Sequence, residues 1–196
     1  MSERPTIYFI RHGETDWNLE GRLQGQQDIP LNDLGRVQAE EAGRRLKGLV
    51  PLFEDLDYVA SPMLRTRETM ERLREAIGLY PNYYRLDERL VELTFGSWEG
   101  MTWKEVRKQE PQLAVLREQD KWNYVPPGGG ESYAMLADRV RPILDDLTRD
   151  TVLVAHGGVA RAFLAVACHV STRHAASIDI WQGKVLVIEG RSYRWA

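Results

Sequence analysis

The chain has 196 residues, enough for one domain with a hydrophobic core, and its hydrophobic fraction of 43% and charged fraction of 28% are typical of a globular protein in water. The formal net charge of −3 provides no concentrated basic surface, which argues against nucleic acid as a partner. No apolar run approaches the roughly 18 residues of a membrane span, and residues 1–5 lack the long apolar region of a signal peptide. The single cysteine, Cys168, excludes an internal disulfide, so we expect a cytoplasmic protein that does not bind membranes.

The first predicted strand ends in a polar motif. Residues 6–10 are apolar or β-branched, which predicts a buried parallel strand, and Arg11, His12 and Gly13 follow directly. Because open α/β sheets bind ligands at the carboxyl ends of their strands, Arg11 and His12 are candidates for an anion site; the alternative is a turn that faces solvent. Gly13 has no side chain, so we expect a bulky group to approach the backbone there. A polar loop is predicted for residues 16–31.

Helical signals surround the second predicted strand. Asn32 is a candidate N-cap for a helix, and residues 56–60 then predict a strand. Ser61 and Pro62 are typical of an N-cap and a first helical residue. Arg65 would then lie in the first helical turn, where the helix dipole disfavours a positive charge. This conflict indicates that Arg65 binds an anion rather than stabilises the helix.

The next part of the chain has weaker patterns. Residues 83–86 predict a strand, and residues 102–120 predict two short helices separated at Pro111. After an irregular stretch, Ser132 is a candidate N-cap for a longer helix. Pro142 lies inside that helix, and we expect it to bend or break the helix.

The last predicted β–α unit has the clearest pattern. Residues 151–155 predict a buried strand, His156 and Gly157 follow at its end, and an apolar helix comes next. Residues 177–180 and 184–188 predict a final pair of strands.

Strands that alternate with helices predict a three-layer α/β/α sandwich, in which helices cover both faces of a mainly parallel sheet with a hairpin at one edge. We predict a single domain over residues 1–196, with a cap-like insertion at about residues 93–133. The edge hairpin offers a surface through which a homodimer could form.

Polar side chains gather at the ends of strands that are predicted to be parallel. His12 and His156 each follow a strand, so they would meet at one edge of the sheet. Arg11 and Arg65 would add two cations there, and arginine is suited to bidentate contacts with phosphate oxygens. The backbone N–H groups after His156, beginning with that of Gly157, would add a helix N-terminus that favours an anion. Together these groups predict a site for phosphoryl transfer that needs no metal ion.

Short motifs that match one protein family occur in order over nearly the whole chain. They comprise residues 11–15, Asn18, residues 24–25, residues 31–35, Ser61-Pro62, residues 65–69, 92–93, 95–100, 127–132 and 156–158, and Arg161. In identity and order these motifs closely resemble the histidine phosphatase superfamily, the phosphoglycerate mutase-like proteins.

The resemblance implies a mechanism. His12 would be the nucleophile that forms a phosphohistidine intermediate, so its reacting nitrogen must be unprotonated while the other nitrogen binds an acceptor such as a backbone carbonyl. Glu92 would protonate the leaving alkoxide and then take a proton from the attacking water. Arg11, Arg65 and His156 would hold the phosphoryl oxygens. The other substrate-binding residues that the resemblance implies are Asn18, Gln24, Gly25 and Gly157.

The activity that the resemblance implies is a cofactor-independent phosphatase for small phosphate monoesters. A phosphoglycerate mutase is the alternative within the same chemistry, but the segment between Glu92 and His156 is shorter than in the cofactor-dependent mutases and leaves less structure to enclose a bisphosphate. A non-catalytic protein that binds phosphorylated ligands is a third hypothesis, which the presence of all the central residues disfavours. No metal-ligand motif unites His12, His156, His169 and His174, so neither a metal nor another cofactor is predicted.

Aromatic residues of the predicted insertion permit two interpretations. Trp98, Trp103, Trp122 and Tyr124 could line a substrate pocket or fill a small core, and the sequence favours neither. We expect the residues that select the substrate to lie in the same region, between positions 102 and 133. The sequence pattern there does not identify the substrate.

Overall fold

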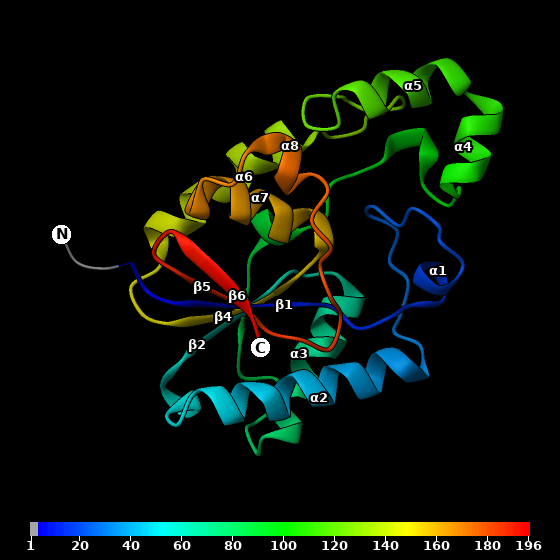
Figure 1. Ribbon diagram of the computed structural model, residues 1–196. Coiled ribbons are helices and arrows are strands. Elements are labelled where there is room, and N and C mark those ends of the chain that lie inside the picture. Colours follow the sequence, from blue (N-terminus) through cyan, green and yellow to red (C-terminus); the bar gives the residue numbers. More distant parts are fainter. Residues whose placement is uncertain (1–3) are drawn as a thin grey trace.

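The computed structural model describes residues 4–196 and shows a six-stranded sheet with helices on both faces (Figure 1). Residues 1–3, the start of the predicted domain, lie outside the described part. The strands are Ile7–Arg11 (β1), Asp57–Ala60 (β2), Arg85–Leu86 (β3), Thr151–Ala155 (β4), Leu186–Glu189 (β5) and Ser192–Trp195 (β6), and their order across the sheet is β3-β2-β4-β1-β5-β6. The first four strands run parallel, whereas β5 and β6 form an antiparallel edge. The predicted sheet, mainly parallel with a hairpin at one edge, is confirmed.

Two layers of helices cover the sheet, and α1, α4 and α5 lie beyond its end. The helices are Asp16–Leu19 (α1), Asp33–Leu49 (α2), Leu64–Ala76 (α3), Trp103–Gln109 (α4), Pro111–Gln119 (α5), Tyr133–Asp146 (α6), Gly157–Cys168 (α7) and Thr172–Ala175 (α8). In Figure 1, α6, α7 and α8 lie above the sheet and α2 and α3 below it. Helices α4 and α5 lie to the upper right, on the side where the parallel strands end.

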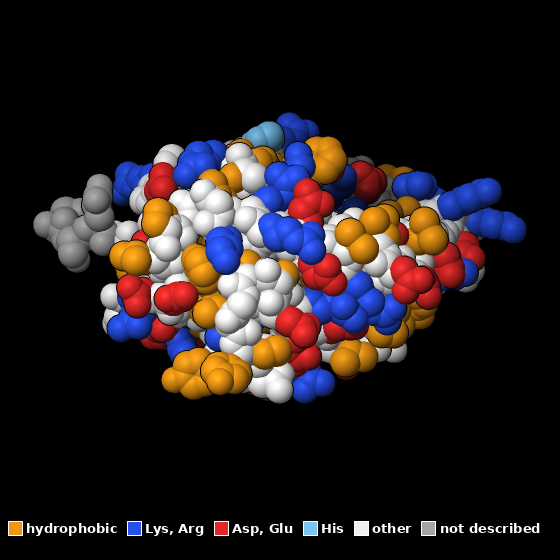
Figure 2. All heavy atoms as spheres, turned by 90° about the horizontal axis from the view of Figure 1, so that it is seen from below, with side chains coloured by type: hydrophobic (Ala, Val, Ile, Leu, Met, Phe, Trp, Pro, Cys, Tyr) orange, Lys and Arg blue, Asp and Glu red, His pale blue; other side chains and the backbone are white. Residues whose placement is uncertain are grey.

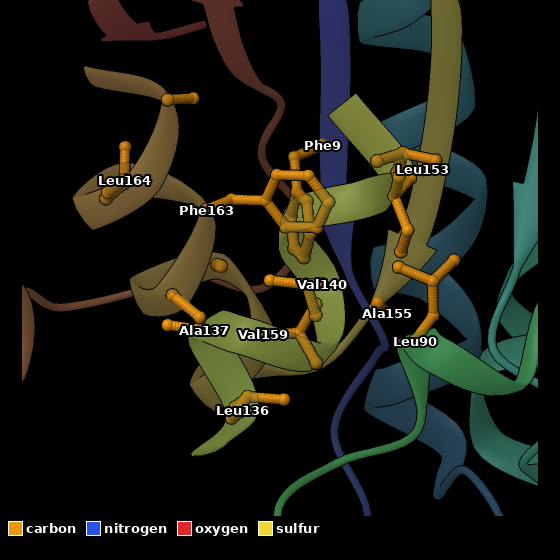
Figure 3. Close-up of a cluster of buried hydrophobic side chains, with 14 of the residues drawn as sticks. Phe9, Leu90, Leu136, Ala137, Val140, Leu153, Ala155, Val159, Phe163 and Leu164 are labelled. Atoms are coloured by element: carbon orange, nitrogen blue, oxygen red, sulfur yellow. The ribbon is translucent and has the colours of Figure 1, made fainter. Parts of the chain in front are cut away.

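Alternate side chains of the strands point to opposite faces and fill two hydrophobic cores. Ile7 and Phe9 of β1 pack with residues of α6 and α7, whereas Ile10 packs with residues of α2 and α3. Figure 3 shows Phe9 beside Phe163 of α7, with ring centroids 6.0 Å apart. Because β4 lies inside the sheet and is covered on both faces, all five of its side chains are buried.

The predicted bounds of the C-terminal strand pair are wrong. The hairpin consists of β5 and β6, and residues 177–180 form irregular structure instead of a strand. The Ile178 carbonyl accepts a hydrogen bond from Arg161 Nε at 2.9 Å. The Ile180 carbonyl accepts one from Arg11 Nη1, also at 2.9 Å. The carbonyl groups of this segment therefore bind arginine side chains rather than a neighbouring strand.

The start of α3 also differs from the prediction. The helix begins at Leu64 with Met63 as its N-cap, so Ser61 and Pro62 precede the helix instead of starting it. The Leu64 N–H donates to Asp28 Oδ1 at 2.7 Å, which satisfies one of the free N–H groups at the helix start. A carboxylate from a distant loop thus replaces the predicted serine cap.

Three smaller departures concern local structure. The predicted loop at residues 16–31 contains α1, whose N-cap Thr15 forms a capping box with Asn18. Strand β3 has two residues rather than the four predicted. Helix α6 runs unbroken through Pro142. Proline has no N–H to donate to the Asp138 carbonyl, but both residues are exposed, so water can bind that carbonyl instead.

The face that includes α2 carries charges of both signs. Figure 2 shows it from below, with basic and acidic side chains interspersed and hydrophobic side chains in small groups. Ion pairs one turn apart on α2 include Arg44 with Glu40 and Arg45 with Glu41. In residues 4–196 no helix combines the length and the apolar character needed to cross a membrane.

Candidate active site

A cavity with a volume of about 210 Å³ lies at the carboxyl ends of β1, β2 and β4. Its walls come from segments far apart in the sequence: the end of β1, the loop after α1, the first turn of α3, the segment after β3, and the start of α7. Arg11, His12, Arg65, Glu92 and Gly157 all line it. The structure therefore brings together the strand ends that the sequence places at one edge of the sheet.

His12 is buried, and its two ring nitrogens have different partners. Nδ1 lies 2.7 Å from the Gly13 carbonyl oxygen, which can only accept, so Nδ1 carries the proton. Nε2 keeps its lone pair and accepts from Arg65 Nε at 3.2 Å. Burial, and then the cations Arg65 and Arg11, lower the pKa of His12 well below its usual range. The ring is therefore neutral at pH 7, with its free lone pair on Nε2.

Arg65 is completely buried, and three hydrogen bonds hold its guanidinium beside His12. Nη1 donates to the Gln27 carbonyl at 2.7 Å, and Nη2 donates to the Gly25 carbonyl at 2.8 Å. Burial lowers the pKa of Arg65 to about 10, so the side chain stays protonated at neutral pH. The N-terminal turn of α3 thus presents a rigid cation to the cavity, against the preference of the helix dipole.

Arg11 supplies a second, partly buried cation. Its Nη1 binds the Ile180 carbonyl, while its Nε is buried and has no hydrogen-bond partner in residues 4–196. Buried N–H groups are almost always paired in native proteins, so this one is a candidate for binding an acceptor on a ligand.

Gly13 has a different role from the one predicted. A Cβ at this position would overlap the backbone of Gly35, so the group that approaches Gly13 closely is the first turn of α2 rather than a ligand. The Gly13 N–H donates to Thr69 Oγ1 at 3.0 Å. The residue after the histidine therefore joins β1, α2 and α3 at the edge of the cavity.

His156 lies behind His12 instead of lining the cavity itself. Its ring is completely buried and stands edge-on to that of His12, with 5.3 Å between centroids. Nε2 lies 2.9 Å from Ser61 Oγ, and Nδ1 has no partner within the described residues. Burial, followed by the cation Arg65, lowers the pKa of His156 well below its usual range, so the ring is neutral. The Ser61 hydroxyl can donate to Nε2 or accept from it, so this contact fits either tautomer of the neutral ring.

Glu92 is anchored by backbone groups on both carboxylate oxygens. Gly158 N–H, at the start of α7, donates to Oε2 at 3.0 Å, and Leu93 N–H donates to Oε1 at 2.9 Å. A Cβ at position 158 would overlap Oε1, so a larger residue there would displace the carboxylate. The helix N-terminus that we predicted to bind a phosphate therefore already holds a carboxylate through Gly158, while Gly157 lines the cavity.

The remaining predicted residues enter the cavity from α1 and the loop that follows it. Asn18 Oδ1 accepts from Gln182 Nε2 at 3.2 Å. The Gln24 amide oxygen is buried without a partner in residues 4–196, and the Gly25 carbonyl holds the α3 arginine. Every predicted binding residue except His156 lines the cavity.

Comparisons with known proteins identify the family. The profile of the histidine phosphatase superfamily (branch 1) matches residues 7–196. The chain belongs to the histidine phosphatase superfamily. A glucosyl-3-phosphoglycerate phosphatase from Mycobacterium tuberculosis is 36% identical over 173 residues, which cover 81% of this chain and 73% of the relative. A 2,3-bisphosphoglycerate-dependent phosphoglycerate mutase from Nitrobacter winogradskyi is 30% identical over 194 residues, 95% of this chain and 92% of the relative.

A solved structure extends the similarity to the whole fold. A mycobacterial glucosyl-3-phosphoglycerate phosphatase in complex with VO3 has a TM-score of 0.81 and 33% identity, over 100% of this chain and 96% of that chain. The predicted phosphoglycerate mutase-like fold is confirmed. Family and relatives together support a phosphoric monoester hydrolase, with a mutase as the second possibility.

This histidine phosphatase has cavity residues that sequence reasoning missed. Arg22, Arg117 and Tyr133 line the cavity, as does Arg161, to which we assigned no role. Ser61, predicted to cap a helix, contacts the second histidine instead. Its position directly after β2 was a signal that could have found it, because that strand ends at the same edge of the sheet.

The aromatic residues divide between the two interpretations. Trp98 is completely buried and stacks on Tyr124 at 5.7 Å in a small core. Trp103 packs on that core and also lines the cavity. Trp122 stacks on Tyr133 at 5.7 Å. Of these four residues, Trp103 is the one that both packs on the small core and lines the cavity.

Proposed function

We propose that this protein hydrolyses small phosphate monoesters through a phosphohistidine intermediate on His12. The observation that carries the proposal is the state of that ring: the Gly13 carbonyl holds the proton on Nδ1, and the lone pair of Nε2 faces the cavity's cations. A neutral imidazole with a fixed tautomer is a nucleophile at neutral pH. Arg11 and Arg65 supply the positive charge that a phosphoryl transition state requires.

In the first step, His12 Nε2 attacks phosphorus, the bond from phosphorus to the ester oxygen breaks, and Glu92 donates a proton to the leaving oxygen. Nε2 gives up its hydrogen bond from Arg65, whose Nε–H then donates to a phosphoryl oxygen. Arg11 Nε, which has no protein partner in residues 4–196, supplies a further donor. Donors held in place before the reaction stabilise the developing charge without reorganisation.

In the second step, water attacks phosphorus of the phosphohistidine. The Glu92 carboxylate takes a proton from this water, the phosphorus–nitrogen bond breaks, and inorganic phosphate leaves. The backbone contacts with Gly158 and Leu93 keep the same carboxyl group in place for both steps.

We expect this reaction to proceed without an added metal ion. The arginines supply charge that metal ions supply in other phosphoryl-transfer enzymes. In residues 4–196 no three His, Cys, Asp or Glu side chains are grouped so that they could hold a metal ion.

A phosphoglycerate mutase is the second candidate, supported by the mutase relative. A mutase must keep water from its phosphoenzyme and return the phosphoryl group to product. The helices α4 and α5 have only seven and nine residues, which limits how far the segment between Glu92 and His156 can enclose the site. This favours hydrolysis.

The test is phosphate release from p-nitrophenyl phosphate and a panel of phosphate monoesters. We expect release by the wild type to persist in EDTA and to need no 2,3-bisphosphoglycerate, and we expect the His12→Asn variant to release none. His169→Asn is the matched control, because His169 has a left-handed φ of 54° at the end of α7, which asparagine tolerates. Isomerised product that strictly requires the bisphosphate would assign a mutase, and full activity of His12→Asn would exclude His12 as nucleophile.

A further inference from the structure

Two segments of the chain carry the groups that act on opposite sides of the bond that breaks. Residues 24–27, which we call the arginine-binding loop, accept hydrogen bonds from the Arg65 guanidinium through two backbone carbonyls. Residues 92–95, which we call the acid segment, begin with Glu92. Because these segments are far apart in the sequence, the contacts between them set the position of the cation relative to the acid.

The Glu99 carboxylate bonds both segments, although it does not line the cavity. In the arginine-binding loop, Oε1 accepts from Gln26 N–H at 3.0 Å and Oε2 accepts from Gln27 Nε2 at 2.9 Å. In the acid segment, Oε1 accepts from Thr94 Oγ1 at 2.8 Å and from Phe95 N–H at 3.2 Å. Hydrogen bonds to an ionised acceptor are roughly twice as strong as neutral ones. One carboxylate therefore fixes two loops of the site.

In the arginine-binding loop, Glu99 acts next to the atoms that hold Arg65. Gln26 lies between Gly25 and Gln27, whose carbonyls accept from the guanidinium at 2.8 and 2.7 Å. A Cβ at Gly25 would overlap the Glu99 carboxylate, and the φ of 51° at this glycine is left-handed. The loop backbone thus packs directly on the carboxylate, so its removal would free the loop and with it the guanidinium.

In the acid segment, Glu99 supplies most of the connection to the loop. In the described part of the chain, the only other hydrogen bond between the two segments runs from Gln26 Nε2 to the Glu92 carbonyl, at 3.1 Å. Thr94 extends the contact with Glu99, because its Oγ1 also accepts from Gly96 N–H at 3.0 Å. The backbone that follows Glu92 is therefore held from Glu99, while the start of α7 holds the carboxyl group itself.

We propose that Glu99 is a positioning residue that sets the Arg65 guanidinium and the Glu92 carboxyl group at fixed places relative to each other. This role rests on the proposed phosphatase function, in which Arg65 donates to a phosphoryl oxygen while Glu92 protonates the leaving oxygen. Both contacts must form at once around one phosphorus atom. A shift of about 1 Å between the two groups would therefore lower the rate about 10²-fold.

Two esters separate the two halves of this role. p-Nitrophenyl phosphate needs the phosphate-binding groups but little help from an acid, because its leaving group departs as a stable anion, whereas sn-glycerol 3-phosphate needs both. We expect Glu99→Ala to lower kcat/KM about tenfold for the first ester and about 10²-fold for the second, so the ratio between them falls about tenfold. A smaller folded fraction would lower both values equally and leave the ratio unchanged.

Binding of inorganic phosphate measures the arginine half without turnover. Calorimetric titration should give a Kd about tenfold weaker for Glu99→Ala than for the wild type, because a displaced Arg65 binds phosphoryl oxygens less well. In a Glu92→Gln background, Glu99→Ala should not lower the ester ratio further, because no acid is left to position. A further fall in that background would overturn the action of Glu99 through Glu92.

Glu88→Ala is the matched control. Glu88 lies exposed just before the acid segment, and its side chain forms no hydrogen bond or ion pair within the described residues, so this variant should keep the wild-type ester ratio and phosphate Kd. Glu99→Gln keeps the shape of the side chain but loses its charge and one of its two acceptor oxygens. It should shift both measurements in the same direction as alanine by a smaller factor, and it serves as the test if Glu99→Ala does not fold.

The outcomes distinguish this role from the proposed function. An ester ratio or a phosphate Kd that stays at the wild-type value in Glu99→Ala, or in Glu99→Gln where only that variant folds, would overturn the role of Glu99, while turnover of both esters would still support the phosphatase. Absence of turnover in the wild type would overturn the phosphatase. The phosphate Kd would then decide on Glu99: a tenfold weaker value in Glu99→Ala supports its hold on Arg65, and an unchanged value overturns it.

Discussion

His12 and Arg65 project from the end of a central strand and from the first turn of a packed helix, whereas Trp103 and Arg117 project from the short helices α4 and α5. The first pair is held by directional hydrogen bonds among buried groups. The second pair is held by ring stacking and by the half-exposed Glu118. The two ends of one cavity are thus positioned by interactions of different strength and direction.

This difference corresponds to different tasks in the proposed reaction. Arg11, His12 and Arg65 contact the group that every substrate shares, and His156 packs behind His12. We call these four residues the phosphate end, and their geometry must be fixed before binding. The other end of the cavity is lined by Trp103, Arg117, Tyr133 and Arg161, which we call the cap end, and it contacts the part of the substrate that varies. Changes at the phosphate end should therefore affect all esters alike, and changes at the cap end should affect only esters with a second anion.

The largest expected effect after loss of the nucleophile comes from Glu92→Gln. Loss of a general acid should lower kcat/KM for an alkyl phosphate about 10²- to 10⁴-fold. The loss for p-nitrophenyl phosphate should be much smaller, because that leaving group departs as a stable anion without a proton. Steady-state kinetics with both esters measure the difference, and equal losses would give Glu92 a positioning role only.

Arg65→Lys should cause a loss of about 10²- to 10³-fold in kcat/KM, as for the removal of one fixed donor in other enzymes. Lysine carries the charge but cannot bind the Gln27 and Gly25 carbonyls while donating to the substrate. The loss should be the same for sn-glycerol 3-phosphate and 3-phosphoglycerate. Arg67→Lys, an exposed position on the same helix, is the control. A loss confined to the ester with the second anion would contradict the division into two ends.

The buried histidines of the phosphate end should make stability depend on pH. Because burial lowers the pKa of His12 and His156, the unfolded chain takes up protons below about pH 6.5 that the folded protein does not bind, so stability rises with pH. The free energy of unfolding should fall as the pH drops below this value, by up to about 1.4 kcal/mol per pH unit for each histidine. Urea unfolding over a pH series measures the slope. His156→Asn should reduce the slope, and an identical slope in this variant would show that His156 is not responsible.

Trp103→Leu should have the smallest effect, at the cap end. Loss of the stacking under Arg117 should lower the ratio of kcat/KM for 3-phosphoglycerate to that for sn-glycerol 3-phosphate about two- to fivefold, as expected for one cation–π contact. Trp181→Leu removes an exposed tryptophan that contacts Lys184 instead, and it should leave this ratio unchanged. If Trp103→Leu slowed sn-glycerol 3-phosphate as much as 3-phosphoglycerate, Trp103 would only shape the cavity.

The positions of the phosphate end could be predicted from the sequence, because short apolar strands mark where His12 and His156 lie. Parallel pairing of those strands then brings the residues after them to one edge. Arg65 was marked by a local conflict with its helix dipole. The roles of these residues stay predictions until they are tested.

The cap end could not be predicted, because its geometry depends on packing between distant segments. Arg117 lies in a short helix of weak pattern, and it stacks on Trp103, which packs against the buried Trp98. The strand predicted at residues 177–180 failed for a related reason. Its carbonyls bind arginines from two other elements, which the alternation of apolar residues does not reveal.

The most direct test of the central claim is to trap the intermediate. The enzyme is mixed rapidly with excess p-nitrophenyl phosphate, quenched in alkali, in which phosphohistidine survives, and digested for mass spectrometry. We predict a phosphorylated peptide whose modified residue is His12, formed and consumed fast enough to account for turnover, and absent in His12→Asn. Turnover without a phosphorylated peptide, or a phosphoryl group on another residue, would contradict the mechanism.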